Sequence, residues 1–343
     1  MYDHRLYAKG VHSVLLVEWV LVCKTPLVIR NGKKLTYTEN TERAKTRGRD
    51  LVLAWPGAER GGQKQSSSVT EAEVASLAYG YVIEDGQVVP YHFVPASSVR
   101  GALRSWTLRH LLHPDWRGKL TPPASDDTAG GTIYLENLRR ALEDRKQGYE
   151  LVASLFGLAT DTRPGEELPG NAGRLAVETA YIHRAGAGAI AAGGVTMTAT
   201  AGPQNAWRQM RVRNPLDRIT HGSKDGGLHH FLEICRGEKF KVQLSIVNPL
   251  DCDLGLLSLW QRELDEGLLR LGALASIGRG RVAVDEQHYT LWKEAMAAPL
   301  RGFAHFEPDD AAEDEDALAG IWQRYRLPSE KLVQFRAALE AYV

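Results

Sequence analysis

The turn at residues 93–104, Phe-Val-Pro-Ala-Ser-Ser-Val-Arg-Gly-Ala-Leu-Arg, constrains the fold of this chain more than any other segment. Its proline ends an extended segment, and Ser97 or Ser98 can cap a helix that runs to Leu112. The first turn of such a helix presents free N–H groups and the positive end of the helix dipole, with Arg100 and Arg104 following on one face. The turn suits a phosphate, although purely structural helices also begin in this way.

A glycine loop near the other end of the chain carries two further arginines. An apolar helical pattern over residues 254–271 breaks into residues 272–282, Gly-Ala-Leu-Ala-Ser-Ile-Gly-Arg-Gly-Arg-Val. The glycines permit close backbone approach, and Arg279 and Arg281 offer planar charged groups that suit phosphate. Dinucleotide and P-loop sites have their glycines between a strand and a following helix, whereas this loop follows a helix and leads into a strand. The element order therefore argues against a mononucleotide site.

Further segments lie between these two in a defined order. Residues 155–157 read Leu-Phe-Gly, and residues 173–180 read Gly-Arg-Leu-Ala-Val-Glu-Thr-Ala. Residues 214–228 begin Asn-Pro-Leu-Asp-Arg-Ile-Thr-His-Gly and precede an alternating pattern that predicts a hairpin, with strands at 228–235 and 240–247. In this order the segments resemble the RAMP superfamily of CRISPR proteins. The resemblance extends over roughly residues 11–285.

The resemblance implies an α+β fold, a ferredoxin-like (RRM-like) palm with helices on one face of an antiparallel sheet. The expected palm elements are strand 13–23, helix 98–112, strand 174–182, the hairpin, helix 254–271 and strand 281–284. No aromatic strand of the kind that stacks bases in an ordinary RRM is visible.

The palm is expected to occupy residues 1–300, with two insertions. Residues 24–92 form a basic lid or finger region, irregular as far as about residue 89, and residues 185–213 form a thumb. Residues 301–343 are expected to be an acidic linker and two helices, at 317–325 and 329–342.

The thumb segment is rich in glycine and alanine and poor in large apolar residues, so it is expected to project from the palm. By resemblance, the thumb of this family inserts between nucleotides of the guide RNA. Ile190 or Met197 would supply the apolar wedge. A surface loop without a function is the alternative reading.

Basic and acidic residues are segregated along the chain. The formal net charge is zero, yet residues 24–64 carry ten basic residues against four acidic ones, and residues 307–316 contain acidic residues and no basic ones. The basic segment suits a phosphate backbone, and the acidic one suits a solvated linker or a basic neighbour.

The expected partners follow from the resemblance: CRISPR guide RNA, a target DNA or RNA paired to that guide, further copies of the chain in a head-to-tail filament, and other effector subunits. The protein would hold the RNA backbone and leave the bases free to pair. The residues expected to contact RNA are Arg30, Asn31, Gly32, Lys33, Ser97, Ser98, Arg100, Arg104, Arg208, Arg211, Arg213, Arg218, His221, Gly278, Arg279, Gly280 and Arg281.

Cleavage of the target is not expected. Type III backbone subunits of this superfamily cut target RNA with an aspartate after the first strand, and Tyr79 falls at the corresponding position here. Asp50 and Glu59 remain as substitutes within the insertion. The chain therefore looks more like the type IV backbone subunit, which works with a DinG-family helicase, and a cutting type III subunit is the alternative.

A metal-dependent hydrolase is a remote alternative. It would use histidines, no two of which lie at the helical spacing of familiar zinc enzymes, together with an aspartate. The candidates are His183, His221, His229 and His230 with Asp217 or Asp225. A structural oligomer without nucleic acid is a third reading. We expect no cofactor and no metal.

The remaining features concern location. No apolar stretch is long enough to cross a bilayer, and the first residues resemble no secretion or lipidation signal, so we expect a cytoplasmic protein without membrane partners. Cys23, Cys235 and Cys252 share no metal-ligand spacing and are expected to be buried, reduced thiols.

Overall fold

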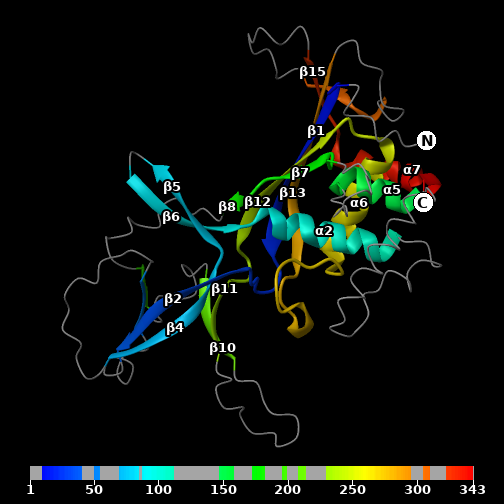
Figure 1. The fold of residues 1–343 in the computed structure, drawn as a ribbon. Coiled ribbons are helices and arrows are strands. Elements are labelled where there is room, and N and C mark those ends of the chain that lie inside the picture. Colours follow the sequence, from blue (N-terminus) through cyan, green and yellow to red (C-terminus); the bar gives the residue numbers. More distant parts are fainter. Residues whose placement is uncertain are drawn as a thin grey trace, which may run out of the picture.

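The fold is built on a six-stranded antiparallel sheet that carries helices on one side (Figure 1). The computed structural model describes residues 10–40, 50–54, 69–84, 87–111, 147–157, 172–181, 195–198, 208–213, 229–294, 304–309 and 322–342. The sheet has the strand order β14-β15-β13-β1-β12-β7. Its strands are β1 (Ser13–Cys23), β7 (Leu175–Val177), β12 (Lys239–Val247), β13 (Val282–Glu294), β14 (Glu307–Pro308) and β15 (Trp322–Arg326).

The central strand β1 shows why one face of this sheet is covered. Alternate residues from Leu15 to Cys23 are almost fully buried, while the residues between them are partly exposed. The buried face packs against α2 (Ala96–Leu111), α5 (Gln147–Phe156) and α6 (Asp251–Glu266), which contribute Leu103, Leu155 and Trp260 to one core. The predicted bounds of β1 are therefore confirmed, and period-two alternation is the reason.

A second six-stranded sheet is formed by segments that lie far apart along the chain. Its order is β10-β11-β4-β2-β3-β9. The strands are β2 (Arg30–Asn40), β3 (Asp50–Ala54), β4 (Val69–Leu77), β9 (Val195–Thr198), β10 (Arg208–Arg213) and β11 (His229–Ile234). The prediction of an irregular insertion over residues 24–89 is wrong, because this stretch supplies strands that pair with each other and with the thumb segment.

The third sheet is small, and one of its strands leads directly into α2. It pairs β5 (Tyr79–Glu84) with β6 (Gln87–Val94), and β6 with β8 (Ala180–Tyr181). The predicted strand 174–182 is thus divided, since β7 belongs to the first sheet and β8 to this one. Two consecutive short strands with one alternating pattern are not distinguished by periodicity.

The predicted hairpin between residues 228–235 and 240–247 is wrong. Both strands exist, but β12 pairs with β1 and β11 pairs with β10 and β4, so the chain crosses from one sheet to the other between them. Cys23 holds the crossing, because its N–H donates to the carbonyl of Glu238 at 2.8 Å and its carbonyl accepts from Gly237 N–H at 2.7 Å. Alternation indicates two strands but cannot say which strand each one pairs with.

The C-terminal segment differs in part from the expected pair of helices. Trp322–Arg326 is a strand that pairs with β13. The predicted helix 317–325 is therefore wrong in the part that the structure describes, residues 322–325. The second helical segment is present as a 3-10 turn, η4 (Ser329–Phe335), followed by α7 (Arg336–Tyr342). Its side chains at Leu332, Phe335 and Leu339 are buried, as the helical spacing predicted.

A buried ion pair joins four elements of the first layer. The guanidinium of Arg174 makes two hydrogen bonds to Asp253, at 2.7 and 3.0 Å, and its Nε–H donates to Ser154 Oγ in α5 at 2.8 Å. It also donates to the carbonyl of Asn248, just after β12, at 3.0 Å. Asp253 in turn accepts the Leu250 N–H at the start of α6. Both side chains are almost inaccessible, at 2% and 0%.

This pair predicts a large stability effect. Arg174→Ala would leave the Asp253 carboxylate buried without its partner, so we expect the free energy of unfolding to fall by about 3–5 kcal/mol. Urea unfolding followed by fluorescence measures this change. Lys331→Ala, which removes the surface pair with Glu307, is the control and should change the free energy by less than about 1 kcal/mol. Similar losses in the two variants would contradict the assignment.

The cysteines give a second prediction. Burial raises the pKa of the Cys23 and Cys252 thiols to about 12, whereas Cys235 is partly exposed. Since the thiolate is the reactive form, Cys23 and Cys252 should resist a thiol reagent at pH 8 in the folded protein. We expect Cys235 to react first, and all three to react in urea. Equal rates for the three thiols in the folded protein would contradict this burial.

Candidate nucleic-acid interface

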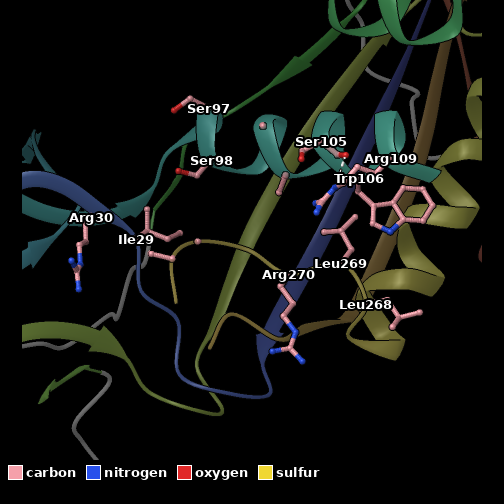
Figure 2. Close-up of a pocket in the computed structure, with 14 residues that line it drawn as sticks. Ile29, Arg30, Ser97, Ser98, Ser105, Trp106, Arg109, Leu268, Leu269 and Arg270 are labelled. Carbon is pink, nitrogen blue, oxygen red and sulfur yellow. Dashed lines mark hydrogen bonds between the residues drawn. The ribbon is translucent and has the colours of Figure 1, made fainter. Parts of the chain in front are cut away.

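A groove of about 470 Å³ runs along α2, between this helix and the loop that follows α6 (Figure 2). Its lining comes from α2, from the loop after α6, and from Ile29 and Arg30 at the start of β2. The lining residues are Ile29, Arg30, Ser97, Ser98, Gly101, Ala102, Ser105, Trp106, Arg109, Leu268, Leu269, Arg270, Gly272 and Ala273. The volume lies in the ordinary range for ligand-binding clefts.

One wall is a single face of α2. The lining residues of this face recur at helical spacing, and most of them have small side chains. The small ones are Ser97, Ser98, Gly101, Ala102 and Ser105. The helix begins at Ala96, and the carbonyl of Pro95 accepts the N–H groups of residues 98 and 99 at 2.9 and 3.3 Å. The two serines therefore lie in the first turn instead of preceding it, as the cap prediction required. Small side chains let a bulky ligand approach the helix closely.

The other wall is the glycine loop, and it is docked on the segment after β1. Ala273 N–H donates to the carbonyl of Val28 at 2.7 Å, and Gly280 N–H donates to that of Pro26 at 2.9 Å. A Cβ at Gly272 would lie 2.3 Å from the Val28 oxygen, and one at Gly280 would lie 2.0 Å from the oxygen of Leu271. Both glycines also have positive φ, so no other residue fits this docking.

The groove is electrostatically one-sided. Arg30, Arg109 and Arg270 line it, and no acidic side chain does. Within the described residues none of these three arginines forms an ion pair, and Arg30 instead lies over the ring of Phe231 at 5.2 Å. Guanidinium groups without a carboxylate partner, beside the N–H groups of a helix start, make a binding surface for phosphate.

The family comparison agrees with this chemistry. The model of the RAMP superfamily matches residues 20–283. The chain belongs to the RAMP superfamily. RAMP proteins bind CRISPR RNA and form complexes of several subunits, so the match indicates a CRISPR-associated RNA-binding subunit. No curated protein matches the chain. In the described part of this RAMP protein, no helix is long and apolar enough to span a membrane.

The groove contains some of the residues that the sequence assigned to RNA and adds others. Arg30, Ser97 and Ser98 line it as expected. Asn31, Gly32 and Lys33 follow Arg30 within β2. Ser105, Arg109 and Arg270 were missed. The helical spacing from Ser98 could have indicated the first two, whereas Arg270 fell inside the predicted helix 254–271 and carried no signal.

Arg100 and Arg104 lie on a different face of α2 from the groove. Arg100 Nη2 donates to the carbonyl of Phe156 at the end of α5, and the guanidinium lies 5.9 Å from the Phe156 ring. A cation at a helix C-terminus compensates the free carbonyls there. Arg104 lies one turn further along α2 from Arg100, and its buried Nε has no hydrogen-bond partner within the described chain.

The two arginines of the glycine loop, Arg279 and Arg281, are held by protein groups. A fully buried carboxylate, Glu233 on β11, accepts from Arg279 Nε at 2.9 Å and from Arg211 Nε on β10 at 2.8 Å. Each arginine directs its Nε at the carboxylate, so the pair ties the glycine loop to the second sheet. Arg281 folds over the end of α6 at Gly267, while the space around Gly278 is open.

The described thumb residues lie in two strands of the second sheet, β9 and β10. Met197 lies in β9 opposite Leu51 of β3, and Arg208 and Arg213 lie at the two ends of β10. Ile190, Arg218 and His221 lie outside the described residues. The thumb therefore includes a strand paired with the 24–92 insertion, and the wedge itself stays a prediction.

Among the described residues, the candidate catalytic side chains are not brought together in one place. Tyr79 begins β5 and Asp50 begins β3, in different sheets, and Glu59 lies outside the described residues. In the part of the chain that the structure describes, no three His, Cys, Asp or Glu side chains are grouped to hold a metal ion. His229 and His230 open β11, and the other residues of the proposed hydrolase, His183, His221, Asp217 and Asp225, lie outside the described ranges.

The position of Arg100 generates a prediction. Arg100→Ala should lower the free energy of unfolding by about 1–2 kcal/mol, because it removes a charged hydrogen bond and a cation–π contact. It should leave the salt dependence of RNA binding unchanged. Thermal unfolding and binding titrations over a salt series measure the two effects. A shallower salt slope at unchanged stability would show that Arg100 contacts RNA instead.

Proposed function

We propose that the chain is a backbone subunit of a CRISPR effector complex and that it holds guide RNA in the α2 groove. The observation that carries the proposal is the groove itself, with Ser97 and Ser98 in the first turn of α2 and Arg30 and Arg270 on the loop side. A phosphodiester fits this arrangement because it accepts hydrogen bonds from helix N–H groups, hydroxyls and guanidinium groups alike.

The strand order supports the assignment of a ferredoxin-like palm. The elements β1, α2, β7, β12, α6 and β13 occur in this order along the chain, with other elements inserted between them, and their strands lie side by side in the order β13-β1-β12-β7. A β-α-β-β-α-β unit with the last strand beside the first and the third strand between the first and the second has the ferredoxin-like arrangement. The groove then lies at the end of β1, beside the first helix of the unit.

Contacts of this kind fix the position of an RNA without reading its sequence. Arginine, serine and helix N–H groups bind phosphates, and sequence is supplied by pairing of the guide with a target. We infer that the bases of the bound guide stay available, and that a target DNA or RNA pairs with them.

The second sheet supports an assembly of stacked copies. It combines the 24–92 insertion with the thumb segment and extends away from the helices that cover the palm (Figure 1). A projecting sheet that meets the palm of the next copy is a heterologous contact, and repeated contacts of that kind produce a filament. We infer that copies line up head to tail along the guide, together with other effector subunits.

The subtype we favour is type IV-like, without target cleavage. Its support is Tyr79, which starts β5 and which the resemblance to type III subunits puts at the position of their cutting aspartate. A DinG-family helicase is then the expected enzymatic partner. Cleavage of a complementary RNA in the presence of magnesium would favour the type III-like alternative.

Binding of a fluorescent guide RNA tests the function. Ser98→Asp places a carboxylate in the first turn of α2, where it repels phosphate, and should weaken binding by more than tenfold. Ser329→Asp, at the first residue of η4, adds the same charge outside the groove and should bind like the wild type. Equal affinities for the two variants, or no binding of guide RNA by the wild type, would contradict the proposed function.

A further inference from the structure

A buried carboxylate holds a pair of arginines outside the α2 groove. Glu233 of β11 is fully buried, and its two oxygens accept from Arg211 Nε at 2.8 Å and from Arg279 Nε at 2.9 Å. Neither arginine lines the groove. Because they bind the two oxygens of one carboxylate, their guanidinium groups are neighbours, although one comes from β10 and the other from the glycine loop.

One carboxylate balances only one of the two positive charges. Arg211 is 51% exposed and Arg279 is 23% exposed. Among the described residues, the Nη groups of the pair make a single hydrogen bond, from Arg279 Nη1 to the carbonyl of Ile277 at 3.4 Å. Glu233 therefore fixes the orientation of both guanidinium groups and leaves their outer N–H groups available for a further anion.

A third arginine lies beside this pair. Arg30 lies over the ring of Phe231 at 5.2 Å, and Phe231 is opposite Arg211 in the register of β10 and β11. Phe231 also precedes Glu233 by two residues on the same strand, so the two share one face of the second sheet. An anion that reaches the pair therefore meets a surface with more positive than negative groups.

The chain carries an acidic segment that suits such a surface. Residues 310–316 contain five acidic residues and no basic one. They belong to the connection between β14 and β15, two strands that pair with each other. The acidic residues just before the segment have partners already, because Glu307 pairs with Lys331 and Asp309 pairs with Arg324. A run of like charge of this kind favours a basic partner.

The acidic segment cannot reach the arginine pair of its own copy. Trp322, where the connection ends, pairs with Glu294 at the end of β13, whereas Arg279 precedes the start of that strand. The 13 residues of β13 separate these points by about 40 Å. A connection over residues 310–321, anchored at both ends, extends outward by at most about 22 Å. Figure 1 accordingly shows β15 and β10 at opposite ends of the molecule.

We propose that the acidic segment of one copy docks on the Arg211–Arg279 pair of the next copy. The proposal rests on the proposed function, because it names a contact by which copies line up head to tail. The pair lies where the glycine loop meets the second sheet, the sheet that we place against the palm of the next copy. Two different surfaces at opposite ends of one subunit make a heterologous contact, which repeats along a filament and gives it a direction.

The chemistry of the contact makes it independent of RNA. A carboxylate accepts two parallel hydrogen bonds from one guanidinium group, and opposite charges steer the two copies together. We therefore expect RNA-free protein to self-associate at low salt and to dissociate at high salt, because salt screens exposed charges. Sedimentation velocity at about 50 and about 500 mM NaCl measures this difference.

Neutralising the acidic segment tests the proposal. The neutral variant should self-associate at least about tenfold more weakly at low salt. Its substitutions are Glu313→Gln, Asp314→Asn, Glu315→Gln and Asp316→Asn. The matched control makes the same change in net charge at exposed glutamates elsewhere and should associate like the wild type. Its substitutions are Glu178→Gln, Glu286→Gln, Glu330→Gln and Glu340→Gln. Wild-type association in the neutral variant, or a monomeric wild type at both salt concentrations, would overturn the proposal.

A mixing experiment tests the direction of the contact. Arg211→Glu reverses the more exposed charge of the pair and should also prevent self-association, while Arg279 still pairs with Glu233. The neutral variant keeps a complete arginine pair, and Arg211→Glu keeps a complete acidic segment. An equimolar mixture should therefore form dimers that grow no further. A mixture that stays monomeric would contradict the head-to-tail contact.

Two further measurements separate the proposal from a folding defect and from RNA binding. If Arg211→Glu melts well below the wild type, Arg211→Ala takes its place in the mixture and should give the same dimers. If the pair serves RNA instead, Arg211→Glu would weaken binding of guide RNA and leave RNA-free association unchanged, which would overturn the proposal. Failure of the wild type to bind guide RNA would remove the proposed function, whereas the contact is measured without RNA.

Discussion

The Arg174–Asp253 ion pair is the constraint on which the arrangement of the groove depends. It is almost inaccessible to solvent, and its guanidinium reaches α5, the end of β12 and the start of α6 at once. Asp253 also accepts an N–H at the first turn of α6, so the pair fixes where this helix begins. The glycine loop leaves the other end of α6, which means that the position of the groove wall follows from the same contact.

The arginines of this RAMP protein divide into two kinds. Arg211 and Arg279 share the buried carboxylate of Glu233, and Arg100 holds the end of α5, so these charges maintain the fold. Arg30, Arg109 and Arg270 have no acidic partner among the described residues and all line the groove. A chain with zero formal net charge therefore still presents a positive surface, because its acidic residues neutralise the arginines elsewhere.

Local sequence patterns predicted which helices and strands exist better than they predicted which strands pair with each other. The alternation in β1, the helix after Pro95 and the apolar helix before the glycine loop were all visible in the sequence, because each depends on neighbouring residues. The separation of β11 from β12, and the pairing of β9 with β3, depend on contacts between distant segments that periodicity does not encode. In the same way Ser97 and Ser98 could be chosen from their place at the start of a predicted helix, whereas the partnership of Arg279 with Glu233 could not.

The central claim is that guide RNA lies in the α2 groove. Purification of the protein from cells that express a CRISPR array, followed by ultraviolet crosslinking and mass spectrometry, tests it most directly. The account predicts guide-length RNA in the preparation and crosslinked peptides from residues 97–109 and 268–273. Guide RNA crosslinked only to other parts of the chain, or a protein that purifies without RNA, would contradict it.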